Sequence, residues 1–414
     1  MRGDRDKRIS DLMSEMLRHR LHQSQIRSLH LQPDRFLLFG RAKVSHSVLL
    51  VVGTRPEAIK LAPLARALDA LGLTPLIVLT GQHAQLDPAA FGLAAYPLLR
   101  LHCTARGDPR LHAEAVANGL APALLGATRP GLLIVQGDTS SALGGALAAT
   151  AAGVPLAHVE AGLRSHDLAM PWPEEGNPVD IDRLSHLLFA ATEENAANLV
   201  AEGVTGDVHV TGNTAIDALF DILAGLPPRL ESHGLPRLLV TCHRRENWGA
   251  AFTPIGLALI ELARLPYLRI EFVLHSSPSV AAAARLLLGG HPRIKLLSPM
   301  DHHAMVAAIR SAHILLSDSG GIQEEAPALG IPLLVLRSTT ERPEGVRSGN
   351  SLLVGSDRDE IVRHVHRLLQ DDETYRAMAV PSLPFGDGKA APRIASLCEQ
   401  WLARQPRPDQ ALTA

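Results

Sequence analysis

The feature that most constrains the fold is a repeated pattern in which a short apolar run leads through a tight turn into a helical segment. The first run, residues 47–52, ends in Gly53 and Thr54, and Pro56 follows at a position suited to the first turn of a helix. The pattern recurs in residues 74–80, 131–153, 154–160, 184–203, 207–223, 237–249, 267–277, 293–298, 313–330 and 331–337. Continuous apolar strands that alternate with helices predict parallel sheets with helices on both faces.

The pattern is interrupted near Pro227 and Pro228, where a polar segment follows, and it then restarts. A length of 414 residues is enough for two separate cores. We therefore predict an α/β protein with two doubly wound, Rossmann-like parallel-sheet domains and a cleft between them. The predicted domains cover residues 47–215, joined by a C-terminal helix at about 388–405, and residues 216–387. Ligands in such sheets bind at the carboxyl ends of the strands.

Residues 1–46 differ from the rest of the chain. They contain ten Lys and Arg against five Asp and Glu, a net charge of +5, and apolar residues recur at helical spacing in 9–26. A basic amphipathic segment of this kind could touch a membrane surface, a partner or the protein itself. We predict a loosely ordered N-terminal extension with no role in the chemistry.

Composition excludes several classes of function. The net charge of −2 gives no global basic field for a nucleic acid. The three cysteines are far apart and odd in number, which favours a reducing cytoplasm over a disulfide framework or a zinc cluster. No apolar run approaches the ~20 residues of a membrane span. We expect a cytoplasmic protein without a bound metal or a transmembrane segment.

The clearest ligand signal in the second half is SDSGGIQEEAPALG (317–330). Ser319, Gly320 and Gly321 stand between an apolar strand and a helix, where free backbone amides can bind phosphate. Glu325 lies about one helical turn further on, where it could meet ribose hydroxyls. Short glycine motifs are weak evidence, and spacing alone leaves an ordinary strand–helix turn as an equal alternative.

Three further strand ends carry charged residues. Arg55 and Lys60 follow the first strand and could both bind a diphosphate, although a capping Arg and a solvated Lys are the commoner case. His243, with Arg244 beside it, follows the first strand of the second domain; the alternative is a structural histidine. Asp138 follows a strand and precedes a helix, so it could equally be a helix N-cap.

Acidic residues concentrate in and beside the stretch 156–178, which runs from a strand end into a polar loop. Glu160 and Glu174 lie in this stretch, and Asp138 belongs to a neighbouring strand end. A polar surface turn is the alternative interpretation of the loop. Taken together with phosphate-binding groups in both halves, the carboxylates indicate acid–base chemistry on a sugar attached to a nucleotide diphosphate.

The chain resembles the non-hydrolysing UDP-N-acetylglucosamine 2-epimerases. The matching motifs run in order from about residue 48 to about residue 390: GTRPEAIKLAPL, TGQH, QGDTSSALGGALAA, HVEAGLRS, PWPEE, FAATEENAANL, VTGNTAID, HRREN, SDSGGIQEEAPALG and TTERPEGV. The resemblance implies a fold of the glycosyltransferase-B type and interconversion of UDP-GlcNAc with UDP-ManNAc. It also implies a homodimer and no cofactor.

The resemblance implies a mechanism in which UDP is eliminated across carbons 1 and 2 of the sugar. UDP then adds back to the 2-acetamidoglucal, and the proton arrives on the opposite face. The implied catalytic residues are Asp138, Glu160, Glu174 and His243. The implied substrate-binding residues are Arg55, Lys60, Arg164, Met305, Ser319, Gly320, Gly321, Glu325 and Arg342. Met305 stands where relatives have an aromatic residue packed on uracil, and Met can fill such a slot.

The sequence departs from the family pattern at several positions. Pro178 follows Asn177 where relatives carry Arg, and HSSPSV (275–280) replaces a segment with Pro flanked by Asn. A second UDP-GlcNAc activates many bacterial members, and Gln82, His83 and Arg244 are the candidate residues of that allosteric site. The alternatives are a relative that acts on a modified sugar such as UDP-2,3-diacetamido-glucuronate and a degenerate UDP-sugar-binding member. A hydrolysing epimerase and a glycosyltransferase of the same fold fit the motifs less well.

Overall fold

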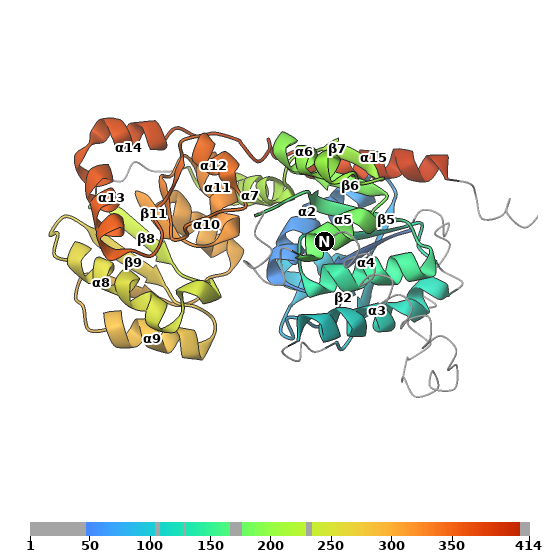
Figure 1. Cartoon of the computed structure of the whole chain (residues 1–414), viewed down its shortest axis with the longest axis horizontal. Helices are drawn as coiled ribbons and strands as arrows, with labels where there is room; N and C mark the ends of the chain where they lie inside the picture. The colour runs from blue at the N-terminus through green and yellow to red at the C-terminus, as the bar shows by residue number, and fades with distance from the viewer. Residues whose placement is uncertain (1–46, 104–107, 127–128, 166–175, 229–233, 406–414) are drawn as a thin grey trace, which may run out of the picture. The chain divides into compact units, whose positions relative to one another are not determined.

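The computed structural model describes residues 47–103, 108–126, 129–165, 176–228 and 234–405. The predicted extension, residues 1–46, and Glu174 lie outside these ranges. The chain divides into two compact units, shown with their element labels in Figure 1. Unit 1 consists of the chain up to Thr214 and of the C-terminal segment that begins at Lys389. Unit 2 spans Ala215–Gly388.

Unit 1 is built on a seven-stranded parallel sheet with the order β3-β2-β1-β4-β5-β6-β7. Its strands are β1 (Ser47–Val52), β2 (Thr74–Leu79), β3 (Leu98–Arg100), β4 (Leu132–Gln136), β5 (Leu156–Ala161), β6 (Leu187–Ala190) and β7 (Asp207–Val210). The direction in which the sheet grows reverses between β1 and β4. Such a reversal leaves a crevice at the carboxyl ends of the two strands.

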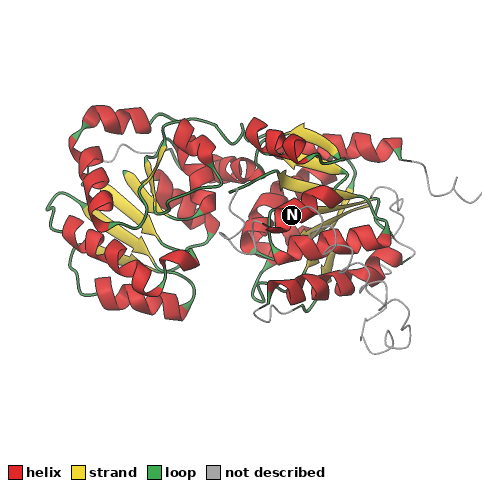
Figure 2. Cartoon of the chain, in the orientation of Figure 1, coloured by secondary structure: helices red, strands yellow, loops and turns green. Residues whose placement is uncertain are grey.

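Helices cover both faces of this sheet (Figure 2). They are α2 (Arg55–Ala70), η4 (Pro88–Phe91), η5 (Leu93–Ala95), α3 (Pro109–Leu125), α4 (Ser140–Ala152), α5 (Gly176–Leu184), α6 (Glu193–Glu202) and α15 (Ala390–Arg404). Successive residues of β1 enter different cores, because Leu50 packs on the α2 side with Ile394 of α15 and Leu49 packs on the opposite side with α3 and α4. The continuous apolar run of β1 therefore follows from burial on both faces.

Unit 2 repeats the architecture with a six-stranded parallel sheet in the order β10-β9-β8-β11-β12-β13. The strands are β8 (Arg237–Thr241), β9 (Arg269–Val273), β10 (Ile294–Leu297), β11 (Ile314–Ser317), β12 (Leu333–Val335) and β13 (Ser351–Leu353). The helices are α7 (Thr214–Gly225, which begins in unit 1), η6 (Arg245–Asn247), η7 (Gly249–Ala251), α8 (Phe252–Leu262), α9 (Pro278–Leu288), α10 (His302–Arg310), α11 (Gly320–Leu329), α12 (Pro343–Arg347), α13 (Arg358–Gln370) and α14 (Asp372–Met378). Here the reversal lies between β8 and β11.

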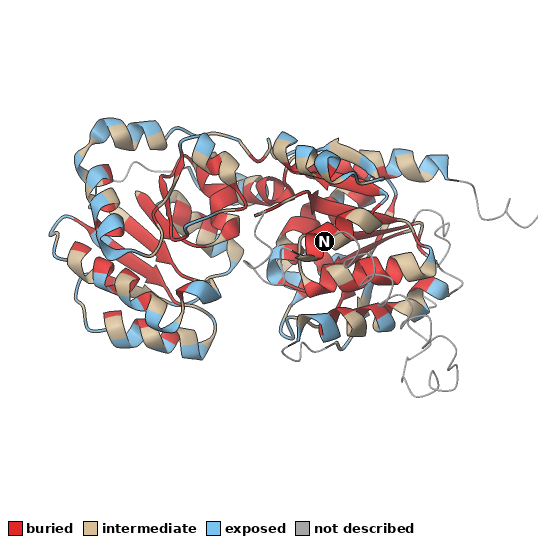
Figure 3. Ribbon diagram, viewed as in Figure 1, coloured by how far each residue is buried: buried red, intermediate tan, exposed pale blue. Residues whose placement is uncertain are grey.

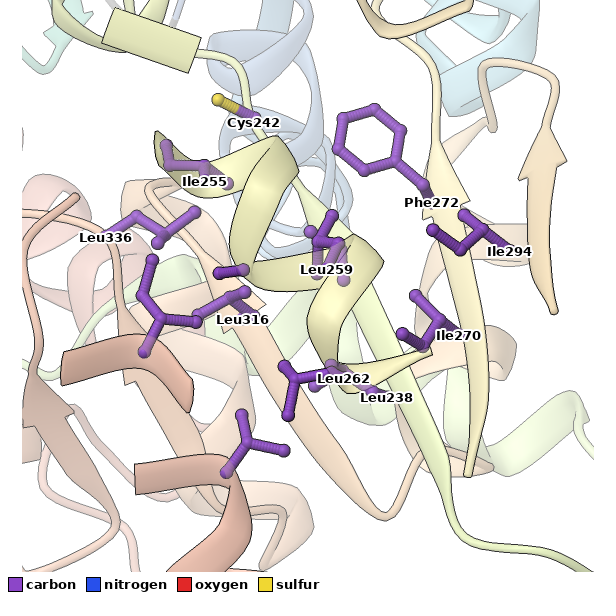
Figure 4. Close-up of a cluster of buried hydrophobic side chains, with 14 of the residues drawn as sticks. Leu238, Cys242, Ile255, Leu259, Leu262, Ile270, Phe272, Ile294, Leu316 and Leu336 are labelled. Carbon is purple, nitrogen blue, oxygen red and sulfur yellow. The ribbon is translucent and has the colours of Figure 1, made fainter. Parts of the chain in front are cut away.

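The core of unit 2 is aliphatic, like that of unit 1. Figure 4 shows one face of its sheet, where Leu238, Ile270 and Leu316 pack against Leu259 and Leu262 of α8. The inner strands are buried in both units, the edge strands β3 and β7 are partly exposed, and the helices expose their outer sides (Figure 3). The predicted doubly wound parallel sheets are confirmed. Within the ranges described above, no helix is long and apolar enough to cross a membrane.

Candidate active site

The turn after β1 and the turn after β4 are joined by Glu57. This fully buried residue accepts hydrogen bonds from Gly53 N (2.7 Å) and Thr54 N (2.5 Å) after β1, and from Thr139 Oγ1 (2.6 Å) after β4. Burial raises the pKa of Glu57 to about 7, although these hydrogen bonds lower it. Glu57 thereby fixes the starts of α2 and α4 at the strand-order reversal, between exposed Arg55 and half-buried Asp138.

Glu160 lies near the end of β5 in an unusual backbone conformation. Its φ is +69°, the only positive φ of a non-glycine residue in the described part of the chain. The register of β5 against β6 shifts between Val159 and Ala161, so Glu160 is the extra residue of a bulge. A non-glycine residue in this conformation costs about 1–3 kcal/mol and persists where its surroundings hold it, commonly at functional sites.

Polar side chains from separate elements hold the Glu160 carboxylate. Lys60 Nζ lies 2.8 Å from both carboxylate oxygens, Asn213 Nδ2 lies 3.3 Å from Oε1, and Gln136 Nε2 donates to Oε2. Glu160 and Lys60 are only 6% and 7% exposed, so the pair is a buried ion pair rather than a surface one. From the sequence we predicted that Lys60 could bind a diphosphate. In the structure Lys60 contacts Glu160, a predicted catalytic residue.

Asp138 lies next to Glu160 across neighbouring strand ends. It belongs to a turn with Gly137, whose φ is +71° and whose Cβ, if it had one, would lie 4.0 Å from Glu160 Oε2. The Asp138 carbonyl accepts a hydrogen bond from Asn177 Nδ2 at 2.7 Å. The Gly137–Asp138 turn therefore lies beside the Glu160 carboxylate.

Arg164, a predicted substrate-binding residue, is buried and makes internal contacts. Its Nε and Nη2 donate to Glu202 at 2.8 and 2.9 Å, Nη2 also donates to Asp182 at 2.7 Å, and Nη1 donates to Leu163 O at 2.9 Å. Burial alone would lower the pKa of Arg164, but the Glu202 and Asp182 carboxylates raise it above its usual range. Because these internal contacts engage all three guanidinium nitrogens, we leave Arg164 out of the proposed substrate site.

The two allosteric candidates of unit 1 lie after β2. Gln82 Oε1 accepts from Ser141 Oγ at 2.6 Å and is therefore engaged with the start of α4. His83 is exposed, and its Nδ1 accepts from Arg55 N at 3.3 Å. Burial of part of the ring, together with the charge of Arg55, lowers the pKa of His83. His83 thus lies beside Arg55, a predicted substrate-binding residue.

In unit 2 the β11–α11 junction has the geometry of an anion site. Ser319 N donates to Ser317 Oγ at 3.0 Å, and the Ser319 side chain makes no capping bond to α11. A Cβ on Gly320 would lie 2.8 Å from Arg342 Nη1, so only glycine lets this guanidinium approach the helix start. A Cβ on Gly321 would meet nothing within 4 Å, which leaves room beside the first turn. Free amides and space at a helix start favour a phosphate.

Asp318 fixes the loop that carries His243, a role that the sequence analysis missed. This fully buried carboxylate accepts from His243 N (2.8 Å), Arg244 N (3.0 Å) and Asn247 Nδ2 (2.8 Å). It therefore joins the ends of β8 and β11 across the strand-order reversal. An acid at the end of an apolar strand was the available signal, but its partners are distant in sequence.

The His243 ring lies in an apolar environment. Its centroid is 5.3 Å from that of His275, which in turn is 5.3 Å from Trp248. A cavity of about 240 Å³ adjoins this group and is lined mainly by apolar side chains, including Phe252 and Phe272. Burial lowers the pKa of His243, and the nearby His275 lowers it further, although Asp318 acts in the opposite direction. His243 is therefore neutral at neutral pH.

The arginines of unit 2 are organised by buried glutamates. Arg342 donates to Glu324 (2.7 Å) and Glu341 (2.6 Å), and Arg244 Nη2 and Arg337 Nη1 also contact Glu341, at 3.1 and 2.5 Å. Burial would raise the pKa of Glu341, but Arg342, Arg337 and Arg244 lower it to about 2. Arg337 Nε also donates to Glu246 at 3.1 Å, so Arg244, named above as an allosteric candidate, and Arg342 belong to one network in which three arginines face three glutamates.

Glu325 and Met305 lie near the start of α10. Glu325 Oε1 is 2.6 Å from His302 Nε2. His302, which was not predicted as a site residue, thus orients Glu325, the residue predicted to bind ribose. Met305 is half-buried and packs against the apolar core beside α11.

Comparisons with known proteins identify the family. The family model described as UDP-N-acetylglucosamine 2-epimerase matches residues 66–399. The "Probable UDP-N-acetylglucosamine 2-epimerase" of Ralstonia nicotianae is 41% identical over 376 residues, which cover 86% of this chain and 99% of that protein. The UDP-N-acetylglucosamine 2-epimerase of Escherichia coli is 39% identical, with 84% of this chain and 96% of that protein covered.

A solved structure agrees with these matches. The crystal structure of UDP-GlcNAc 2-epimerase from Neisseria meningitidis bound to UDP-GlcNAc has a TM-score of 0.79 at 35% identity, and covers 86% of this chain and 100% of that chain. The chain belongs to the UDP-N-acetylglucosamine 2-epimerase family, an enzyme family. The predicted family and the predicted fold class, two doubly wound domains of the glycosyltransferase-B type, are confirmed.

Proposed function

We propose that the protein interconverts UDP-GlcNAc and UDP-ManNAc without hydrolysing them. The observation that carries this proposal is the buried Glu160, which has a strained backbone conformation, pairs with Lys60 and lies beside the Gly137–Asp138 turn. A carboxylate placed at such a cost beside a second acid is suited to proton transfer. Family membership supplies the substrate class.

In the proposed reaction a base removes the proton on carbon 2 while the bond between carbon 1 and the UDP oxygen breaks. The electron pair of the C2–H bond forms the double bond of 2-acetamidoglucal, and UDP leaves with the pair of the C1–O bond. In the return step a proton is delivered to the opposite face of carbon 2, and the UDP oxygen adds to carbon 1. Two faces require two positioned groups, and Glu160 and Asp138 are our candidates. Glu174, which lies outside the described residues, stays a predicted third.

We assign nucleotide binding to unit 2. The amides at the start of α11, with Ser319, would bind phosphate, and Glu325, oriented by His302, would accept hydrogen bonds from ribose. Met305 would pack against uracil. The neutral His243 can donate a hydrogen bond to the leaving phosphate oxygen, and Arg342 can add positive charge there. Arg55 of unit 1, which is exposed, stays a candidate for the diphosphate.

Product analysis tests this proposal. Incubation with UDP-GlcNAc, followed by proton NMR, should give an equilibrium mixture of two UDP-sugars that differ at carbon 2. Starting from UDP-ManNAc should give the same mixture. Free ManNAc and UDP as the main products would contradict the non-hydrolysing assignment, and the absence of any new UDP-sugar would contradict the function. A panel with UDP-2,3-diacetamido-glucuronate shows whether a modified sugar is preferred.

The resemblance also leads us to propose a homodimer. Light scattering of the purified protein should give the mass of two chains, about twice the 44.3 kDa of one. The mass of a single chain at working concentration would contradict this proposal.

A further inference from the structure

A buried network connects the turn after β4 with the turn after β5. Asp182 of α5 is fully buried, and its Oδ1 lies 2.5 Å from His158 Nδ1. Its Oδ2 accepts from Gly162 N at 3.2 Å and from Arg164 Nη2 at 2.7 Å. On the other side of the imidazole, His158 Nε2 lies 2.9 Å from Gly137 O. One carboxylate is thus linked to both turns.

Both ring nitrogens of His158 face groups that only accept hydrogen bonds, the Asp182 carboxylate at Nδ1 and the Gly137 carbonyl at Nε2. Burial alone would raise the pKa of Asp182, but the His158 ring and the Arg164 guanidinium lower it below its usual range. Arg164, which is bound to Glu202, completes the network. Asp182 and Arg164 form a charged pair in the interior, where hydrogen bonds are strong and fix the positions of the side chains that they join.

The network contacts the backbone beside both proposed catalytic acids. Gly137 immediately precedes Asp138, and Gly162 is two residues beyond Glu160. Helix α5 also supplies Asn177, which donates to the Asp138 carbonyl at 2.7 Å. The two carbonyls of the Gly137–Asp138 turn are therefore both held, one through His158 and one by Asn177 directly.

We propose that His158 and Asp182 are positioning residues that fix the distance and orientation of Asp138 relative to Glu160. Neither touches the reacting atoms. The inference rests on the proposed function, because that function assigns proton transfer to the two acids. A displacement of about 1 Å in a catalytic group can lower a rate by about 100-fold, so loss of this restraint should appear in kcat.

A matched pair of variants separates positioning from general structural support. The amide nitrogen of Gln occupies the place of Nε2, so His158→Gln keeps a donor to Gly137 O and loses the one to Asp182. The amide nitrogen of Asn occupies the place of Nδ1, so His158→Asn keeps the donor to Asp182 and loses the one to Gly137 O. Each variant removes one hydrogen bond of the same buried ring.

We expect His158→Asn to lower the kcat of epimerisation about 100-fold with little change in KM, and His158→Gln to retain about a tenth or more of the wild-type kcat. The control is His186→Gln. It removes a histidine-to-backbone hydrogen bond at the amino end of β5, where His186 Nδ1 accepts from Leu156 N at 3.3 Å, and kcat should stay within about twofold. Equal losses in the two His158 variants, or a larger loss in His158→Gln, would overturn the proposal.

Hydrogen exchange provides a readout that does not depend on turnover. In the full-length protein, amides of residues 137–139 should exchange faster in His158→Asn than in His158→Gln, at equal free energies of unfolding. Unchanged exchange in His158→Asn would overturn the positioning role. If the wild type turns over no UDP-N-acetylhexosamine, the proposed function fails, while selective loosening of this turn in His158→Asn still supports the positioning of Asp138.

Discussion

The two strand-order reversals carry polar sites of opposite design. Beside the β1–β4 reversal of unit 1, at the end of β5, Glu160 is a buried carboxylate on a strained backbone, and Lys60 neutralises it. At the β8–β11 reversal of unit 2 the backbone is regular, and Asp318 is used to hold backbone amides. A group that transfers a proton must have two protonation states in one place, whereas an anion site needs fixed donors. This difference agrees with our proposal that proton transfer takes place in unit 1 and nucleotide binding in unit 2.

The largest effect predicted from this difference between the units is that of Glu160→Gln. The amide keeps the size of the side chain but cannot take up a proton, so kcat should fall at least about 1,000-fold. UDP affinity should change less than about twofold, because all the proposed UDP-binding residues except Arg55 lie in unit 2 and Glu160 is not one of them. Kinetics and calorimetric titration with UDP measure the two quantities. Glu193→Gln, an exposed substitution in the same unit, is the control and should be neutral; a large loss of UDP affinity in Glu160→Gln would contradict the division.

A second prediction concerns Glu57 and the pH dependence of stability. Its pKa is raised from 4.5 to about 7 in the folded protein, so the folded state binds the proton more tightly than the unfolded chain does. The protonated group contributes its full stability below pH 4.5, and that contribution falls as the pH rises to about 7, by about 3 kcal/mol in total.

Glu57→Gln should remove this slope. Urea unfolding of the wild type and the variant, measured from pH 4.5 to 8, gives the difference in the free energy of unfolding. We expect the free energy of unfolding of the variant to increase relative to that of the wild type as the pH rises. A difference that stays constant over this range would show that Glu57 does not titrate there.

A third and smaller effect is expected in unit 2 from Asp318→Asn. The amide can accept some of the hydrogen bonds from His243 N, Arg244 N and Asn247, but its NH₂ group must face a donor. Loss of a charge-assisted contact of this kind costs about 1.5–3 kcal/mol, so UDP affinity should fall about 10- to 100-fold. Asp357→Asn, at the N-cap of α13, keeps a capping oxygen and is the control. Unchanged UDP binding in Asp318→Asn would show that the loop carrying His243 and Arg244 does not contribute to nucleotide binding.

Much of the fold could be predicted from the sequence, because the inner strands are largely apolar runs that lead through turns into helices; the short strands β3 and β13 were not predicted. The same pattern placed Asp138, His243 and Ser319 at strand ends, where the structure has them. Local patterns carry this information, since burial on both faces of a parallel sheet requires apolar residues at every position.

The partners within each site could not be predicted. Lys60 is 100 residues from Glu160, and His243 is 75 residues from Asp318. Their pairing depends on the strand order, which no local motif specifies. The positive φ of Glu160 follows from a bulge that depends on the neighbouring strand. The resemblance implied that Arg164 binds the substrate, and its contacts with Asp182 and Glu202 could not be predicted from a local motif either.

The most direct test of the central claim is the fate of solvent deuterium. With UDP-GlcNAc in deuterium oxide, elimination and re-addition of UDP predict deuterium at carbon 2 of both epimers, including substrate that has returned from the glycal. The Glu160→Gln variant, which should still bind UDP, should incorporate almost none. Formation of the 2-epimer with the original hydrogen retained at carbon 2 would contradict the account, because proton exchange at unit 1 would then play no part in the inversion.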